Sequence, residues 1–258
     1  MTATASRRPA VVFLHGVGGS AQVWAPQLAA FAAASFAPIA LDLIGYGTRP
    51  AVTVMNFDDL AADVEEAIAR QGLERPVLVG HSLGGMVAQT ALRRRPEGYS
   101  AAILSATSPA FGNPAGDFQR KFVSDRLGPL QGGKTLPELA ADIVAGIIGP
   151  APEPAGRALA IAAMSAVHPD TYRAAVRCLV TFDERANLAA IRVPVLCLAG
   201  AHDRNAPAQM MQRMASQIAG ATFYCLPAVG HLANLEAPAA FNAASLDFLC
   251  RLFKSAPV

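Results

Sequence analysis

The sequence contains few charged residues and almost no excess of either sign. Of its 258 residues, 16% are charged, and the formal net charge at neutral pH is +2. A nucleic-acid-binding surface is therefore not expected, because such a surface needs a strongly basic patch. The basic run at 93–95 follows a helical pattern and indicates a helix C-terminus, where cations suit the helix dipole.

Cysteine is also sparse, and its spacing matches neither a metal site nor a disulfide-rich scaffold. The four residues are Cys178, Cys197, Cys225 and Cys250. Cys197 and Cys225 lie inside apolar runs typical of strands, so we expect both to be small buried hydrophobic residues. The spacing predicts no metal site.

Long uninterrupted apolar segments are absent from the sequence. No run of 18 apolar residues is free of polar breaks, so a transmembrane helix is not expected. The N-terminus has two arginines but only a short apolar run before a glycine, and it lacks the pattern of a signal peptide. These absences predict a cytoplasmic protein that does not associate with membranes.

Apolar material itself is plentiful, at 53% of the residues, and it is arranged in short runs that alternate with helical patterns. The runs cover 10–14, 38–43, 76–80, 101–106, 193–200 and 221–227. After the second run, Asn56 is suited to cap a helix whose apolar residues share one face. The pattern predicts an α/β fold with a mostly parallel six-stranded sheet and helices on both faces.

Residues 110–185 interrupt this alternation. The segment is rich in glycine and proline, and its periodic stretches are helical. Thr135 and Glu138 have the spacing of a capping box, and the apolar residues that follow them, as far as Ile147, line one face. About 75 residues is more than a single crossover needs. We therefore predict a helical cap at 110–185, inserted into a core formed by 1–109 and 186–258.

The segment GHSLGG places Ser82 between Gly80 and Gly84, after an apolar run and before a helical pattern. A strand that turns sharply into a helix brings its backbone close to itself, and glycines two positions before and after the apex allow this approach. The apex side chain is then exposed at the carboxyl edge of the sheet, where parallel sheets bind ligands. Ser82 is the candidate nucleophile.

A serine nucleophile needs a base within hydrogen-bond reach. His231 follows the last apolar run in a loop that would lie at the carboxyl edge of the sheet, and it is the candidate base. His15 and His81 adjoin the predicted turns and are interpreted as structural. The two histidines that remain are His168, in the insertion, and His202, beside Asp203.

The base must be oriented by an acid. Asp203 lies in the loop after the fifth run, and it is the candidate because an elbow framework has the chain order serine, acid, histidine. Asp42, at the end of the second run, and Asp183, at the end of the insertion, are the alternatives.

Acyl transfer also requires hydrogen-bond donors for the oxyanion of the tetrahedral intermediate. The backbone N–H of Leu83, at the start of the predicted helix, is one candidate. The glycine-rich loop after the first run can supply the other, for which we select Val17, with Gly18 as the alternative.

Five ordered motifs, LHGVGGSAQVW, LDLIGYG, GHSLGG, LAGAHDRNAP and VGHLANLEAP, resemble the α/β-hydrolase superfamily over nearly the whole chain. Within it, the chain most resembles the branch of 3-oxoadipate enol-lactonases and small carboxylesterases. The resemblance implies the triad Ser82–Asp203–His231, a helical cap and no cofactor. Serine at the elbow disfavours the dehalogenase and epoxide-hydrolase relatives, which carry aspartate there.

One departure from the superfamily pattern is the short segment before the first run. About ten residues precede it, so we expect the usual N-terminal hairpin to be missing and the 38–43 strand to lie nearest the shortened edge. An exposed edge invites pairing, which makes a homodimer possible.

Together these residues predict a serine hydrolase that cleaves a small carboxylic ester or lactone through an acyl-enzyme. The apolar composition of the insertion indicates a small or medium apolar substrate. Two alternatives stay open. One is carbon–carbon bond hydrolysis or acyl transfer by the same triad, and the other is a hydrolase-like receptor that binds a small molecule.

Overall fold

The computed structural model describes residues 8–112 and 115–254. Within these residues, six strands form one sheet in the order β2-β1-β3-β4-β5-β6, and every neighbouring pair is parallel. The strands are β1 (Ala10–Leu14), β2 (Ala37–Leu41), β3 (Val77–His81), β4 (Ala101–Ser105), β5 (Val195–Gly200) and β6 (Thr222–Leu226). The predicted six-stranded sheet is confirmed, with β2 at an edge, and the described residues 8 and 9 before β1 carry no strand.

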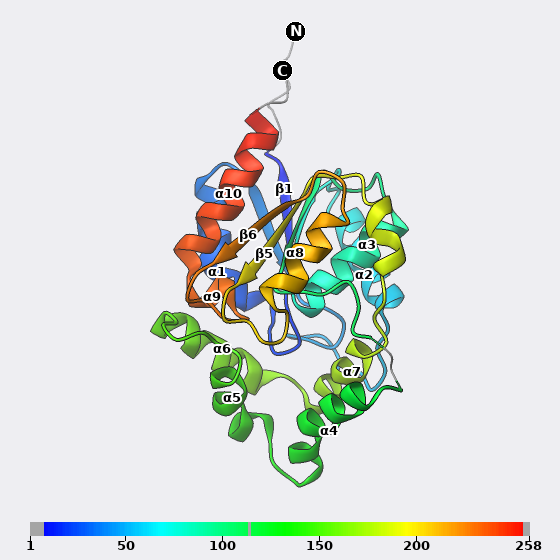
Figure 1. Cartoon of the computed structure of the whole chain (residues 1–258), viewed down its shortest axis with the longest axis vertical. Coiled ribbons are helices and arrows are strands. Elements are labelled where there is room, and N and C mark those ends of the chain that lie inside the picture. Colours follow the sequence, from blue (N-terminus) through cyan, green and yellow to red (C-terminus); the bar gives the residue numbers. More distant parts are fainter. Residues whose placement is uncertain (1–7, 113–114, 255–258) are drawn as a thin grey trace.

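Helices cover both faces of the sheet (Figure 1). Helices α1, α9 and α10 lie on one side of it, and α2, α3 and α8 on the other. The helices are α1 (Ala25–Ala33), α2 (Phe57–Arg70), α3 (Leu83–Arg94), α4 (Asp117–Gln131), α5 (Leu136–Ala145), α6 (Pro154–Ala166), α7 (Pro169–Leu179), α8 (Ala208–Ser216), α9 (Ala233–Glu236) and α10 (Pro238–Lys254), with 3-10 turns η1 (Ala21–Trp24) and η2 (Arg185–Ala190).

Two hydrophobic cores result from the alternation of side chains along the strands. In β1, Val12 and Leu14 pack in the core that contains residues of α2, α3 and α8. Val11 and Phe13 point the other way, into the core that contains residues of α1 and α10. Because β1 is buried on both faces, its sequence reads as a continuous apolar run rather than an alternating one.

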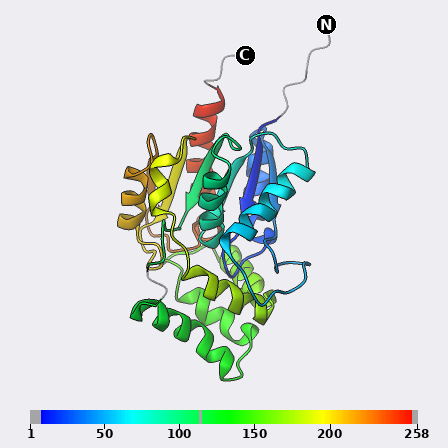
Figure 2. The ribbon, with the colours of Figure 1, turned by 90° about the vertical axis from the view of Figure 1, so that its right-hand side faces the viewer.

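Helices α4 to α7, called here the insertion helices, lie between β4 and β5 in the sequence and beyond one end of the sheet in space (Figures 1 and 2). Ala110 and Asp183 form an isolated antiparallel bridge, so the chain leaves the core and returns to it at neighbouring points. This bridge lies near both predicted limits of the insertion. The division into core and cap at these limits remains a prediction.

Three local expectations are corrected by the structure. The second strand ends at Leu41, so Asp42 follows the strand instead of closing it. Helix α5 ends at Ala145, so Ile147 lies after the helix and not on its face. Cys197 is buried as expected, but Cys225 is only half-buried because β6 is an edge strand.

Along the described ranges 8–112 and 115–254, no helix has both the length and the apolar character required to span a bilayer. The sheet has two edge strands, β2 and β6. A homodimer remains a prediction.

Candidate active site

Ser82 occupies a strained turn between β3 and α3. Its φ of 53° and ψ of −116° lie in a region that residues other than glycine rarely adopt. A Cβ atom on Gly80 would come within 2.4 Å of the Gly84 carbonyl oxygen, and one on Gly84 within 2.2 Å of the Leu14 oxygen. The close approach predicted for the two glycines is therefore present.

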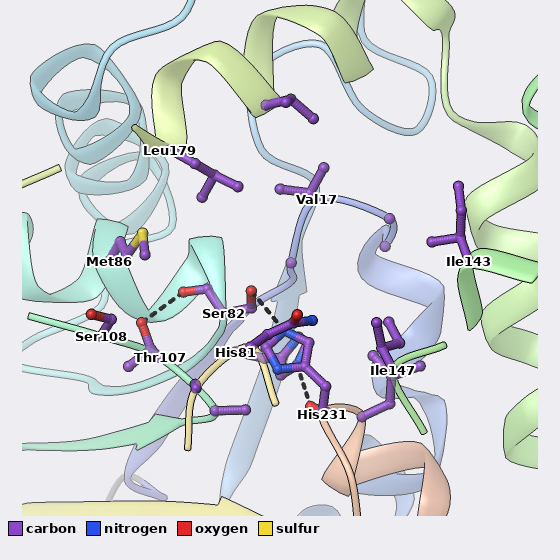
Figure 3. Close-up of a pocket in the computed structure, with 18 of the residues that line it drawn as sticks. Val17, His81, Ser82, Met86, Thr107, Ser108, Ile143, Ile147, Leu179 and His231 are labelled. Carbon is purple, nitrogen blue, oxygen red and sulfur yellow. Dashed lines mark hydrogen bonds between the residues drawn. The ribbon is translucent and has the colours of Figure 1, made fainter. Parts of the chain in front are cut away.

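Backbone and side-chain hydrogen bonds hold this turn in place. The N–H of Ser82 donates to the carbonyl of Ser105 at the end of β4, 3.0 Å away. The carbonyl of Ser82 accepts from the N–H groups of Gly85 and Met86 and from the hydroxyl of Thr107, at 2.9 to 3.1 Å. The bond from Thr107 is drawn in Figure 3. These contacts fix the backbone from which the Ser82 side chain projects into the pocket.

The structure brings Ser82, His231 and Asp203 together in a chain of hydrogen bonds (Figure 3 shows the first two). Nε2 of His231 lies 3.0 Å from Oγ of Ser82, and Nδ1 lies 2.8 Å from Oδ2 of Asp203. His231 and Asp203 are buried, with 7% and 5% of their surface exposed. Three segments distant in sequence thus meet at the carboxyl edge of the sheet.

Asp203 is held as a carboxylate by its surroundings. Its Oδ1 accepts from the backbone N–H groups of Asn205 and Ala206, at 2.8 and 3.0 Å. Burial alone would raise the pKa of Asp203, but His231 and these two N–H groups outweigh it and hold the pKa below its usual value. An ionised Asp203 fixes the proton on Nδ1 of His231, which leaves Nε2 free to accept a proton from Ser82.

The two alternative acids lie outside this chain. Asp42 accepts from the backbone N–H of Ala21 at 2.7 Å, and Asp183 forms an exposed ion pair with Arg185. Both carboxylates therefore have partners of their own away from His231.

His81 does not contact Ser82 as a base but supports the loop of His231. Its Nε2–H donates to the backbone carbonyl of His231 at 2.8 Å. Burial, together with the neighbouring His231, lowers the pKa of His81 to about 3, so the ring is neutral. The interpretation of His81 as structural agrees with this contact.

The remaining histidines are also engaged elsewhere or exposed. Nδ1–H of His15 donates to the Gly16 carbonyl, and its Nε2 accepts from the N–H of Leu43. His168 precedes α7 and accepts from the N–H of Asp170, while His202 is exposed.

Of the two predicted oxyanion donors, Val17 lines the pocket that contains Ser82 and His231, and Leu83 follows Ser82 directly in the chain. Leu83 is the first residue of α3, and Val17 lies in a turn closed by a hydrogen bond from Gly19 N–H to the Gly16 carbonyl. The hydroxyl of Tyr46 donates to the carbonyl of Val17 at 3.0 Å and so holds the peptide that joins Val17 to Gly18. Among residues 8–112 and 115–254, neither the N–H of Leu83 nor that of Val17 donates a hydrogen bond to another residue. Their role as oxyanion donors remains a prediction.

A cavity of about 390 Å³ opens over Ser82 and His231. The insertion helices and the chain that joins them supply most of its apolar wall, including Ile143, Ile147 and Leu179 (Figure 3). Its cationic lining residues are Arg126, on α4, and Arg204, beside the acid. In the described part of the chain, no group of three His, Cys, Asp or Glu side chains is arranged to hold a metal ion.

The sequence motifs did not reveal four residues that contact the site: Tyr46 and Thr107, described above, and Ile147 and Glu236. The carbonyl of Ile147 accepts from the N–H of His231, and the carboxylate of Glu236 accepts from the N–H groups on either side of it. Tyr46 lies in the motif LDLIGYG and Glu236 in VGHLANLEAP, so these motifs could have indicated that both residues lie near the site. Thr107 and Ile147 contribute through contacts that depend on the path of the chain in space, and no local pattern indicates them.

Comparison with known proteins places these features among hydrolases. A sequence model described as the alpha/beta hydrolase family matches residues 11–244. RutD of Variovorax paradoxus is 33% identical, over 96% of this chain and 93% of the relative. Its name describes it as a carbamate hydrolase by inference. A synthase of 2-succinyl-6-hydroxy-2,4-cyclohexadiene-1-carboxylate from Serratia proteamaculans is 27% identical, over 94% of this chain and 93% of its own length.

Solved structures agree with this placement. A hydrolase from Pseudomonas aeruginosa superimposes with a TM-score of 0.84 at 28% identity, covering 95% of this chain and 91% of that one. The enol-lactonase of Burkholderia xenovorans gives a TM-score of 0.85 over 95% of this chain and 93% of its own, and at 23% identity it speaks to the fold alone.

Proposed function

This chain belongs to the alpha/beta hydrolase family, and we propose that it cleaves a small carboxylic ester or lactone through an acyl-enzyme on Ser82. The observation that carries the proposal is the continuous hydrogen-bonded chain from Ser82 through His231 to Asp203 at the floor of the cavity. Such a chain activates a hydroxyl that would otherwise be a poor nucleophile.

In the first half of the reaction, Oγ of Ser82 bonds to the carbonyl carbon while its proton passes to Nε2 of His231. The carbonyl electron pair moves onto oxygen, where the N–H groups of Leu83 and Val17 donate to it. The intermediate then collapses, and the departing alkoxide takes the proton from Nε2. The acyl group remains on Ser82.

In the second half, water attacks the acyl carbon and gives a proton to Nε2 of His231. Collapse of the second intermediate returns this proton to Oγ of Ser82 and releases the carboxylic acid. Asp203 keeps its charge throughout, orients the imidazole and stabilises the imidazolium that forms twice in each cycle.

The lining of the cavity supports a small, largely apolar substrate. Ile143, Ile147 and Leu179 offer no hydrogen bonds and favour an alkyl or alicyclic acyl group. Arg126 adds a cation whose guanidinium lies 5.5 Å from the ring centroid of Phe122. A substrate screen should therefore pair each neutral ester with an analogue that carries a carboxylate.

Carbamate hydrolysis is the second candidate reaction, supported by the name of the 33% identical relative. A carbamate carbonyl can be attacked by the same hydroxyl. Carbon–carbon bond cleavage and acyl transfer use the same three residues, and the name of the synthase relative keeps them in the screen.

The test is turnover of a short p-nitrophenyl ester by the wild type and by the Ser82→Ala and Ser165→Ala variants. Ser165 lies on α6 and bonds to the carbonyl of Ile161, so its variant is the matched control. We expect Ser82→Ala to lose at least about 10⁴-fold in kcat, and Ser165→Ala to stay near the wild-type value.

Retention of activity by Ser82→Ala would overturn the proposal. A wild type that binds lactones or esters, as a rise in melting temperature, but releases no product would instead favour a receptor. Parallel assays on lactones, carbamates, dienoic diketones and added acyl acceptors would identify the reaction class.

A further inference from the structure

We propose that Glu236 is a positioning residue for the base His231. Its carboxylate bonds to the backbone on both sides of His231, and it also bonds to the insertion. The proposal rests on the function proposed above. Glu236 ends the short helix α9 and has no role in either half of the proposed reaction.

The carboxylate of Glu236 is buried, with 3% of the residue exposed, and three backbone N–H groups donate to it. Oε2 accepts from Gly230 at 2.9 Å and from Gly149 at 2.6 Å. Oε1 accepts from Leu232 at 2.8 Å. Two of the three donors are the residues immediately before and after His231, so the carboxylate fixes the backbone on both sides of the base.

The third donor, Gly149, belongs to the segment after α5, and this segment also contacts the base directly. The N–H of His231 donates to the carbonyl of Ile147 at 2.8 Å. A further bond, from the N–H of Glu153 to the carbonyl of Glu236, spans 2.9 Å. The base loop is thus held by the insertion as well as by the core.

The backbones of these segments pack closely against one another. A Cβ atom on Gly149 would come within 2.5 Å of the Ala228 carbonyl oxygen, and one on Gly230 within 2.5 Å of the Gly149 nitrogen. On the other side, a Cβ atom on Gly200 would come within 2.1 Å of the Gly230 oxygen. Because these backbones are in close contact, the position of His231 is sensitive to the carboxylate that accepts from both segments.

Loss of the carboxylate would leave three N–H groups without their acceptor around a buried position. Such groups must find water or another partner, and the loop must move to let them. A displacement of about 1 Å at a catalytic group can cost about 100-fold in rate. The expected defect is therefore in kcat, through His231, and not in substrate binding.

Glu184 offers a matched control. It is the other buried glutamate of the described chain, with 6% exposed, and it accepts from Arg93 and Asn187 at the junction of α3 with η2. Its replacement removes a buried carboxylate of similar exposure from a place outside the cavity lining.

The experiment compares Glu236→Ala, Glu236→Gln and Glu184→Gln with the wild type, using a p-nitrophenyl ester and the rate of Ser82 labelling by a fluorophosphonate. We expect kcat and the labelling rate to fall about 100-fold in Glu236→Ala, with KM within about twofold of the wild type. Glutamine keeps one acceptor oxygen but turns an amide N–H toward a backbone N–H, so Glu236→Gln should lose about tenfold. Glu184→Gln should lower the melting temperature and leave kcat within about twofold.

A readout independent of turnover is the ¹H NMR signal of the proton on Nδ1 of His231, shared with Asp203. It should be broadened or lost in the Glu236 variants and kept in Glu184→Gln. Should the alanine variant fail to fold, the glutamine variant decides the outcome.

The proposal is overturned if the folded Glu236 variants keep kcat within about twofold, or if Glu184→Gln loses as much as they do. A wild type that neither turns over ester nor labels Ser82 would defeat the proposed function instead. The NMR signal would then still report whether Glu236 positions His231.

Discussion

The loops of the core and the insertion helices contribute different things to one cavity. The core loops carry the polar groups, each tied by hydrogen bonds whose partners lie on neighbouring strands and turns. The insertion helices present mainly apolar side chains, both aliphatic and aromatic, to the same space, together with Arg126. From this difference we expect bond cleavage to depend on the core and substrate choice on the insertion. The two parts meet where Ile147 and Gly149 bond to His231 and Glu236.

Among substitutions in the core loops, we expect Asp203→Asn to reduce kcat the most. The amide oxygen can keep the bonds from Asn205 and Ala206, but the NH₂ group then faces Nδ1 of His231 and favours the tautomer that carries its proton on Nε2. That imidazole cannot accept the proton of Ser82. We expect kcat to fall about 10⁴-fold, measured by steady-state ester hydrolysis.

Asp42→Asn is the matched control for this prediction, because Asp42 is a half-buried carboxylate that accepts from Ala21. It should lose less than about threefold in kcat. Equal losses in the two variants would mean that Asp203 has no special relation to the base.

The role of the insertion in substrate choice is tested by Ile143→Ala. Removal of this side chain enlarges the cavity, so the ratio of kcat/KM for a long-chain ester to that for a short-chain ester should rise roughly 30-fold. The kcat for the short ester should change little. Competition between the two esters measures the ratio.

Ile161→Ala is the control for the insertion, since Ile161 is half-buried on α6 and does not line the cavity. Its ratio should equal that of the wild type. An unchanged ratio in Ile143→Ala would break the assignment of substrate choice to the insertion.

The smallest effect concerns stability and not rate. Burial lowers the pKa of His15 to about 4, although its bond to Gly16 and the charge of Asp42 oppose the shift. The unfolded chain takes up this proton below about pH 6.5 while the folded protein does not, so stability falls as pH drops from 6.5 to 4. His15 adds about 1.4 kcal/mol per pH unit to this slope.

His15→Gln should reduce the slope of unfolding free energy against pH by that amount, as urea titrations between pH 4 and 6.5 would show. His81 keeps its own contribution in both proteins, because its pKa is also depressed, to about 3. A slope identical in the two proteins would contradict a neutral, buried His15.

The elements and groups that could be predicted from the sequence are those with a local sequence pattern. The apolar runs and flanking helices predicted the sheet because a parallel strand buried on both faces leaves that pattern. Gly80 and Gly84 indicated the turn at Ser82 because steric contact there excludes larger residues. The order of Ser82, Asp203 and His231 selected the acid over Asp42 and Asp183, and the structure brings those three together.

The supporting contacts could not be predicted from the sequence, because they join segments that only the folded chain brings together. Thr107 reaches the carbonyl of Ser82, and Glu236 reaches Gly149, across long sequence separations. The true end of α5 also mattered, since the carbonyl of Ile147 can accept from His231 only because the helix stops at Ala145.

The most direct measurement is the site of covalent modification during turnover. Wild-type protein quenched with acid in the presence of a p-nitrophenyl ester, then digested and weighed by mass spectrometry, should carry one acyl group on the peptide that contains Ser82. The Ser82→Ala protein should carry none. An acyl group on another residue, or full turnover with no acylated peptide in either protein, would contradict the assignment of Ser82 as nucleophile.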